Sequence, residues 1–198
     1  MVYPTRNIRV KTIRYLVSLF CLLGCHAASA TIWQSDSTNS HLYFAPSYEG
    51  MPINGAFKQF STLYQTDSQG QPDSLRVNIA ITSADLGNSD LNEAIGAIDW
   101  FNISDFPQAQ FTSEEFSYGG EGLFLAKGTL QLKGFKKTIT VPFRWRANSE
   151  DSASMTGELI LSRNDFFIGT GEWASGEQIG LAVKVWFEVV FTRSKTDL

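Results

Sequence analysis

Hydrophobic and polar residues alternate with a period of two over most of this sequence from residue 39 onward. Val, Ile, Leu, Phe and Trp take every second position in the longest runs, which are 75–82, 139–146 and 183–191. Such alternation is typical of strands that bury one face and expose the other. Clusters rich in Gly, Pro, Asn, Asp and Ser separate the runs, at 68–73, 119–122, 133–137 and 148–152. Because these residue types favour turns, the pattern predicts an antiparallel meander, and hence an all-β barrel or sandwich.

One segment breaks the alternation. In residues 90–99 the apolar side chains follow helical spacing instead, at Leu91, Ile95 and Ile98. Asp90 is placed to cap a helix there, and Glu93 follows three residues later, as in a capping box. The pattern predicts a short helix or irregular excursion that runs to Pro107. The segment 88–107 is a candidate lid over one end of a barrel.

The first thirty residues have the composition of a secretory signal peptide. Basic residues without any acid precede an apolar run of about eleven residues from Tyr15 to Cys25, and Ala28-Ser29-Ala30 follows. The run is shorter than the roughly 20 residues of a membrane-spanning helix, which disfavours an uncleaved anchor. Leu22-Leu23-Gly24-Cys25 also resembles a bacterial lipobox, so lipidation of Cys25 is the alternative to cleavage after Ala30. Residues 1–30 are therefore predicted to be removed, leaving one domain at 31–198.

The charge of residues 31–198 narrows the classes of partner. Of the 16 basic and 20 acidic residues of the chain, four basic and no acidic ones lie within 1–30, which leaves a net charge of −8. This sign disfavours nucleic acid, which requires clustered Lys and Arg, and an anionic membrane surface. Fifteen Phe, five Trp and six Tyr leave room for an apolar ligand site as well as a core.

Few residues point to catalysis or to metal binding. His41 is the only histidine after residue 30, and both cysteines precede that residue. A metal site built from His or Cys, or a triad with a His base, is therefore not expected. Carboxylates are numerous, and an acid–base pair among them is the one enzyme alternative. Gly169-Thr170-Gly171 lacks the further glycines and the lysine of a phosphate-binding loop, and it is interpreted as a turn with positive φ. The residues predict a binding protein rather than an enzyme, with no cofactor and no metal.

Arg163 falls on the inner face of a predicted strand, at the end of the run Met155, Gly157, Leu159 and Leu161. A buried guanidinium is unfavourable unless it is paired. Two interpretations remain open. Arg163 either meets the polar head of a ligand at the mouth of a barrel, or forms a salt bridge with Asp165 that fixes a turn.

Five short stretches together resemble the YceI-like family of bacterial periplasmic lipid-binding proteins, over about residues 33–191. They are GAFKQF at 55–60, DWFNISDFP at 99–107 with Phe111 after it, GTLQLKG at 128–134, SRNDFFIG at 162–169 and GEW at 171–173. Three departures from the family pattern are present. Phe167 replaces a glycine, residues 91–95 lack the family's Arg-Asp-x-His-Leu, and residues 136–139 lack its Thr-Lys-Pro-Val.

The resemblance implies an eight-stranded, antiparallel, lipocalin-like barrel with a short helical insertion. It also implies a non-enzymatic protein of the periplasm that carries a polyisoprenoid or quinone-like chain inside the barrel. A stress or surface-interaction barrel with a filled core is one alternative, and an outer-membrane β-barrel is another. The sequence indicates neither a partner in the inner membrane nor an oligomeric state.

The predicted ligand-binding residues are the inward apolar positions together with Arg163. They are Leu42, Phe44, Phe57, Phe60, Val77, Ile79, Phe101, Phe111, Leu130, Leu132, Val141, Phe143, Trp145, Leu159, Leu161, Arg163, Phe166, Trp173, Val185 and Phe187.

Overall fold

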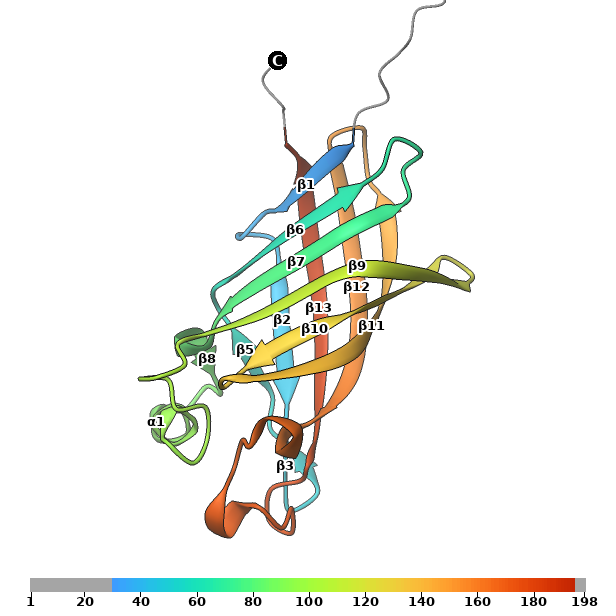
Figure 1. The fold of residues 1–198 in the computed structure, drawn as a ribbon. Helices are drawn as coiled ribbons and strands as arrows, with labels where there is room; N and C mark the ends of the chain where they lie inside the picture. Colours follow the sequence, from blue (N-terminus) through green and yellow to red (C-terminus); the bar gives the residue numbers. More distant parts are fainter. Residues whose placement is uncertain (1–29, 195–198) are drawn as a thin grey trace, which may run out of the picture.

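A computed structural model describes residues 30–194, and most of these lie in strands (Figure 1). The predicted signal peptide and Cys25 fall outside the described residues, except for Ala30. The strands are β1 (Thr31–Ser35), β2 (His41–Ala45), β3 (Ser47–Tyr48), β4 (Met51–Pro52), β5 (Gly55–Phe57), β6 (Phe60–Thr66), β7 (Pro72–Ala80), β8 (Ala84–Asp85), β9 (Gln108–Gly120), β10 (Leu123–Leu132), β11 (Phe135–Ala147), β12 (Ser152–Ser162) and β13 (Ala182–Arg193). The helical elements are α1 (Ser89–Gly96) and the 3-10 helices η1 (Ile81–Ser83), η2 (Arg163–Phe166) and η3 (Gly171–Trp173).

Eight antiparallel strands close into a barrel. Their order is β1, β6, β7, β9, β10, β11, β12 and β13, and β13 pairs again with β1. This confirms the predicted all-β barrel with one short helix. Along its edge β13 pairs with β1 near Arg193 and with β2 between Lys184 and Glu188. Strands β1 and β2 are therefore two parts of one barrel strand, and β2, β5 and β8 continue the wall toward the end of the barrel where α1 lies.

Short hydrogen bonds stabilise the breaks in the wall between β5 and β6 and between β1 and β2. Between β5 and β6, the Ser83 hydroxyl accepts a bond from the Gln59 amide at 2.9 Å and donates one to the Ala80 carbonyl at 2.7 Å. Between β1 and β2, the Asp36 amide donates to the Val190 carbonyl at 2.8 Å. The wall can therefore change direction without leaving these backbone groups unpaired.

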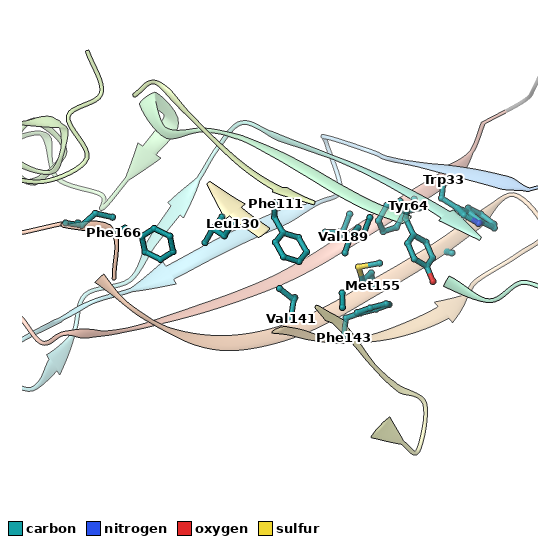
Figure 2. Close-up of a cluster of buried hydrophobic side chains, with 14 residues drawn as sticks. Trp33, Tyr64, Phe111, Leu130, Val141, Phe143, Met155, Phe166 and Val189 are labelled. Atoms are coloured by element: carbon teal, nitrogen blue, oxygen red, sulfur yellow. The ribbon is translucent and has the colours of Figure 1, made fainter. Parts of the chain in front are cut away.

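Aromatic residues fill one end of the barrel. Trp145 packs against Trp33, Tyr64 and Phe191, with ring centroids 5.4, 4.6 and 5.2 Å away. Tyr64 and Phe143 are fully buried and pack edge to face. Figure 2 shows Trp33 and Tyr64 at this end, whereas Leu130 and Phe166 lie toward the other. The end that carries the aromatic cluster is closed by side chains, and the end near α1 is called the mouth below.

The ladder between β11 and β12 covers only part of their length. It joins Arg144–Ala147 to Ala153–Thr156 and stops there. Pro142 has no amide proton to continue it. Toward the mouth, β11 follows β10 away from β12, as Figure 1 shows. The barrel wall is therefore joined by strand pairing at the aromatic end but not between these two strands at the mouth.

The cap of the short helix α1 lies two residues earlier than the sequence predicted. The side chain of Asn88, not that of Asp90, caps it by accepting bonds from the amides of Asp90 and Leu91. Both residues are good caps, and the bonds from two amides decide between them. No helix among the described residues is long and apolar enough to cross a membrane.

Gly128 on β10 leaves room for the neighbouring strand. A Cβ there would lie 2.1 Å from the Thr112 carbonyl of β9, beside a shift in register that follows Lys127. The Ser113 hydroxyl donates to the Lys127 carbonyl at 2.8 Å and so fixes this irregularity. Because a backbone atom cannot rotate away, any larger side chain forces two strands apart.

We expect Gly128→Ala to lower the free energy of unfolding by about 1–3 kcal/mol, as overpacking of a core does. Urea denaturation of the variant measures this. Thr129→Ala, at the exposed neighbouring position, is the control and should stay within about 0.5 kcal/mol of the wild type. Wild-type stability of Gly128→Ala would contradict the described approach of β9 and β10.

Candidate ligand cavity

The barrel interior contains two adjoining chambers. The chamber at the mouth has a volume of about 140 Å³, and the deeper one has a volume of about 110 Å³. Five side chains belong to the walls of both, namely Leu42, Ile79, Leu130, Leu161 and Val185. Along β13 the walls extend from Val183 to Val189, which is about 20 Å of strand at roughly 3.3 Å per residue. The space is therefore narrow and elongated.

Nearly all of the wall is apolar. Ser162 and Arg163 are the polar residues of the mouth chamber, and Thr62 is the polar residue of the deep chamber. No Asp, Glu, His or Lys belongs to either wall. An apolar cavity of about 150 Å³ stays dry and accepts an apolar molecule. These chambers are each close to that size, so they favour an apolar occupant over water.

Segments outside the barrel strands cover the mouth chamber. Ile95 of α1 and the following Trp100 and Phe101 contribute to its wall, as do Phe166 and Ile168 around η2. The two segments are tied together at Asp99, whose carbonyl accepts bonds from the amides of Gly169 and Thr170 at 2.7 and 3.0 Å. The segment 88–107 thus lies over the mouth, where the sequence placed a candidate lid.

Arg163 anchors the loop that joins β12 to β13. Its side chain is buried, with 3 % of its surface exposed, and all of its bonds go to main-chain carbonyls. Nη1 donates to Ile168 and Gly169 at 2.7 and 2.9 Å. Nε donates to the Gly180 carbonyl at 3.1 Å, and Nη2 donates to the carbonyls of Ile179, at 2.7 Å, and Trp173.

Nε makes one of these bonds, and Nη2 makes two. With the two bonds of Nη1, the guanidinium makes five hydrogen bonds in all. A guanidinium has five N–H donors, so each of them is used by the protein itself. Gly169 must be a glycine here, because a Cβ would lie 2.3 Å from Nη1 of Arg163.

Both earlier interpretations of Arg163 need revision. Asp165 is exposed and is not among its partners, so the predicted salt bridge is wrong. No donor is left for a ligand's polar head, although the side chain belongs to the wall of the mouth chamber. Burial lowers the pKa of Arg163, and the ring of Trp100 lies 5.6 Å from its Cζ atom. Arg163 therefore fixes the loop by hydrogen bonds to main-chain carbonyls, and not by a salt bridge to the carboxylate of Asp165.

Comparison with known proteins finds the same barrel fold in solved structures and identifies the family of this chain. The model of the YceI-like domain matches residues 33–191. The chain belongs to the YceI-like family. The crystal structure of BcnA from Burkholderia cenocepacia is similar, with 30% identity, a TM-score of 0.74, and coverage of 79% of this chain and 98% of that one. A UPF0312 protein of Shewanella baltica is 29% identical over 157 residues, which are 74% of this chain and 82% of the relative.

A more distant structure shares the fold of this YceI-like chain. It is a polyisoprenoid-binding domain from Saccharophagus degradans, described as implicated in plant cell wall breakdown. It is 18% identical, with a TM-score of 0.67, and the match covers 82% of this chain and 98% of that domain. The family resemblance seen in the sequence is thereby confirmed, and so is the barrel fold.

Most of the predicted ligand-binding residues of this YceI-like barrel belong to the chamber walls. Those of the mouth chamber are Leu42, Phe44, Phe57, Ile79, Phe101, Leu130, Leu132, Leu161, Arg163, Phe166 and Val185. The deep chamber adds Phe60, Val77, Phe111, Val141, Leu159 and Phe187. The alternation therefore identified the inward face of most strands.

Three predicted residues lie elsewhere. Phe143 and Trp145 point inward as expected, but they belong to the aromatic cluster that closes the far end. Trp173 of η3 packs against Trp100, with ring centroids 5.9 Å apart, and so lies behind the wall rather than in it. Alternation gives the face of a strand but not the level along the barrel axis, which decides between core and cavity.

Several wall residues were absent from the prediction. Leu75, Ile139, Met155, Val183 and Val189 lie on the inward faces of the predicted strands, so the same alternation could have included them. Ile95, Trp100 and Ile168 come from segments without a period of two. Only their position over the mouth, which no local pattern shows, brings them to the wall.

We expect Arg163→Lys to lower the free energy of unfolding by about 2–4 kcal/mol. An ammonium has three donors instead of five, so at least two buried carbonyls lose their partner. Guanidinium denaturation measures the loss, and Arg146→Lys at an exposed position is the control, with a change within about 0.5 kcal/mol. Unchanged stability together with altered preference for lipid head groups would instead favour ligand contact by Arg163.

Proposed function

We propose that this YceI-like protein binds a long, apolar lipid, such as a polyisoprenoid or the tail of an isoprenoid quinone, in its two chambers. The observation that carries the proposal is the elongated space itself, whose wall is apolar along about 20 Å of strand. The aromatic cluster closes one end, so a chain enters from the mouth. The structure of the polyisoprenoid-binding domain of Saccharophagus degradans supports this class of ligand.

The physical driving force is burial of the chain. Each methylene that leaves water gains about 0.8 kcal/mol, before the costs of ordering and association. A chain of ten or more carbons therefore offsets those costs without specific polar contacts. Because Arg163 has no free donor, the chambers select for the length and width of an apolar chain and not for its head.

The two other functions proposed from the sequence fit these features less well. A barrel with a filled core would lack the chambers. An outer-membrane barrel has an apolar outer face and a polar interior, whereas here the interior is apolar and the alternating residues of the walls, such as Arg76 and Lys184, are exposed. An enzyme based on paired carboxylates would need acids beside the ligand, and neither wall has one.

We further propose that the protein acts as a carrier in the periplasm, after removal of residues 1–30. The support is the composition of that segment. Mass spectrometry of the protein recovered from the periplasm is expected to show a chain that begins at Thr31. A chain that begins at an acylated Cys25 would contradict this and would place the protein on a membrane instead.

We expect the purified protein to contain, or to take up, a polyprenol or an isoprenoid quinone, detected by solvent extraction and mass spectrometry. Leu161→Trp, on the wall shared by both chambers, should reduce uptake about tenfold or more, since exclusion of two or more methylenes loses about 0.8 kcal/mol each.

The matched control is Ile160→Trp, the next residue on β12, which is 72% exposed. It should take up lipid as the wild type does. Equal uptake by both variants would place the ligand outside the chambers, and an empty extract with no uptake by the wild type would contradict lipid binding.

A further inference from the structure

Two aromatic rings lie stacked on the surface beside the mouth. Phe135 begins β11 and Phe167 follows η2, and their ring centroids are 4.6 Å apart with an interplanar angle of 27°. They remain 40% and 55% exposed. The neighbours of Phe167 in sequence, Phe166 and Ile168, belong to the wall of the mouth chamber. The exposed pair is therefore on the outer side of the same loop that covers the ligand site.

Phe167 holds an unfavourable backbone conformation. Its φ is +51° and its ψ is +39°, in the left-handed region that glycine adopts without strain. A non-glycine residue there is disfavoured by about 1 kcal/mol or more. Because the ring is more exposed than buried, packing returns little of this free energy. An exposed aromatic residue kept at a strained position points to a role outside the folded core.

The hairpin that carries Phe135 is basic, although the chain as a whole is acidic. Between Glu121 and Glu150 the sequence has six Lys and Arg residues and no acid. Lys136 and Lys137 follow Phe135 directly, are exposed, and take part in none of the ion pairs among the described residues.

Other charges near this surface are few. Lys133 is buried and donates from Nζ to the Phe167 carbonyl at 2.7 Å, which joins the hairpin to the loop after η2. Burial lowers the pKa of Lys133, and Asp99 opposes this shift. Asp165 of η2 is an exposed acid in the neighbouring loop. Side chains alternate along β11, so Lys137 lies on the same face as Phe135 and Lys136 lies on the opposite face. The surface therefore combines two aromatic rings with the unpaired cation of Lys137, beside the buried Lys133.

We propose that Phe135, Phe167 and Lys137 form a docking surface for a bilayer that contains anionic phospholipids. Exposed aromatic rings insert at the level of the head groups, and cations beside them attract anionic lipids. The surface lies at the mouth, where strand pairing between β11 and β12 is missing, so docking presents the chambers to the bilayer. That last step rests on the proposed function, whereas docking itself does not.

Docking on an anionic bilayer differs from the expectation drawn from net charge. A net charge of −8 disfavours an anionic membrane only if the charge is spread evenly, because exposed charges further apart than about 10 Å are largely screened. The hairpin places its cations within a few residues of the two rings. The charge of this local surface, and not the net charge of the chain, then decides whether an anionic bilayer binds.

The test uses the full chain with Cys25→Ser, so that no acyl group can attach it to lipid, purified after export. Cosedimentation is measured with vesicles of phosphatidylcholine and phosphatidylglycerol, and with phosphatidylcholine alone. We expect binding to the mixed vesicles that weakens in high salt, and weaker binding to phosphatidylcholine alone.

Phe167→Gly is the decisive variant. It should bind the mixed vesicles at least about fivefold more weakly, while its melting temperature stays equal or rises because glycine relieves the strained φ. A purely structural role for Phe167 predicts the reverse, a lower melting temperature with unchanged vesicle binding. The control Ile160→Ser, which removes an exposed apolar side chain of β12, should bind as the wild type does.

Lys137→Ser should weaken binding to the mixed vesicles about fivefold. Arg76→Ser, which changes the net charge equally on the exposed face of β7, should not. Wild-type binding by both Phe167→Gly and Lys137→Ser would overturn the proposal. Vesicle binding without any lipid uptake would contradict the proposed function alone, and uptake without vesicle binding would contradict the docking surface alone.

Discussion

The bonds of Arg163 are the interaction on which the mouth of this barrel depends. The chain from Asn164 to Leu181 contains no strand and pairs with Tyr48 in an isolated bridge at Ile179, so it has no continuous ladder of backbone bonds. One buried guanidinium supplies five donors to five of its carbonyls. An unpaired buried carbonyl is unfavourable by about 1–3 kcal/mol, so without this side chain the loop could not remain folded over an apolar chamber. The same bonds leave Arg163 unable to recognise a ligand.

The position of the aromatic residues explains why the barrel is hollow at one end only. An eight-stranded barrel is just wide enough for its own side chains or for a small ligand. Trp33, Tyr64, Trp145 and Phe191 fill it at the end where β11 pairs with β12 and β13 pairs with β1. Toward the mouth the wall combines aliphatic residues, such as Leu130 and Leu161, with rings such as Phe44, and space remains between them. The four rings thus supply the packing at the closed end, and the chambers lie beyond them.

How far the sequence predicted this structure depends on whether a feature is local. Alternation is local, and it correctly gave the inward residues of β7, β11, β12 and β13. The motif glycines are also understandable in physical terms, since Gly128 and Gly169 each leave room that a Cβ would fill. The level of a residue along the axis is not local, so Phe143 and Trp145 could not be separated from the chamber wall. The partners of Arg163 lie up to seventeen residues away in an irregular loop, and no periodic pattern indicates them.

The net charge of the chain likewise does not show how its charged residues are distributed over the surface. The composition disfavours anionic surfaces, yet the ribbon formed by β10 and β11 carries six cations and no acid between Glu121 and Glu150. The pairing of β11 with β12 ends near Pro142 within this ribbon. On that side the mouth-side part of β11 meets the loop after η2 through Lys133, Phe135 and Phe167, whereas β10 keeps its ladder with β9. These contacts are few and partly exposed, in contrast to the continuous ladders elsewhere. The part of the wall that is least held by strand pairing is therefore also the part whose charge and exposed rings suit contact with a lipid surface.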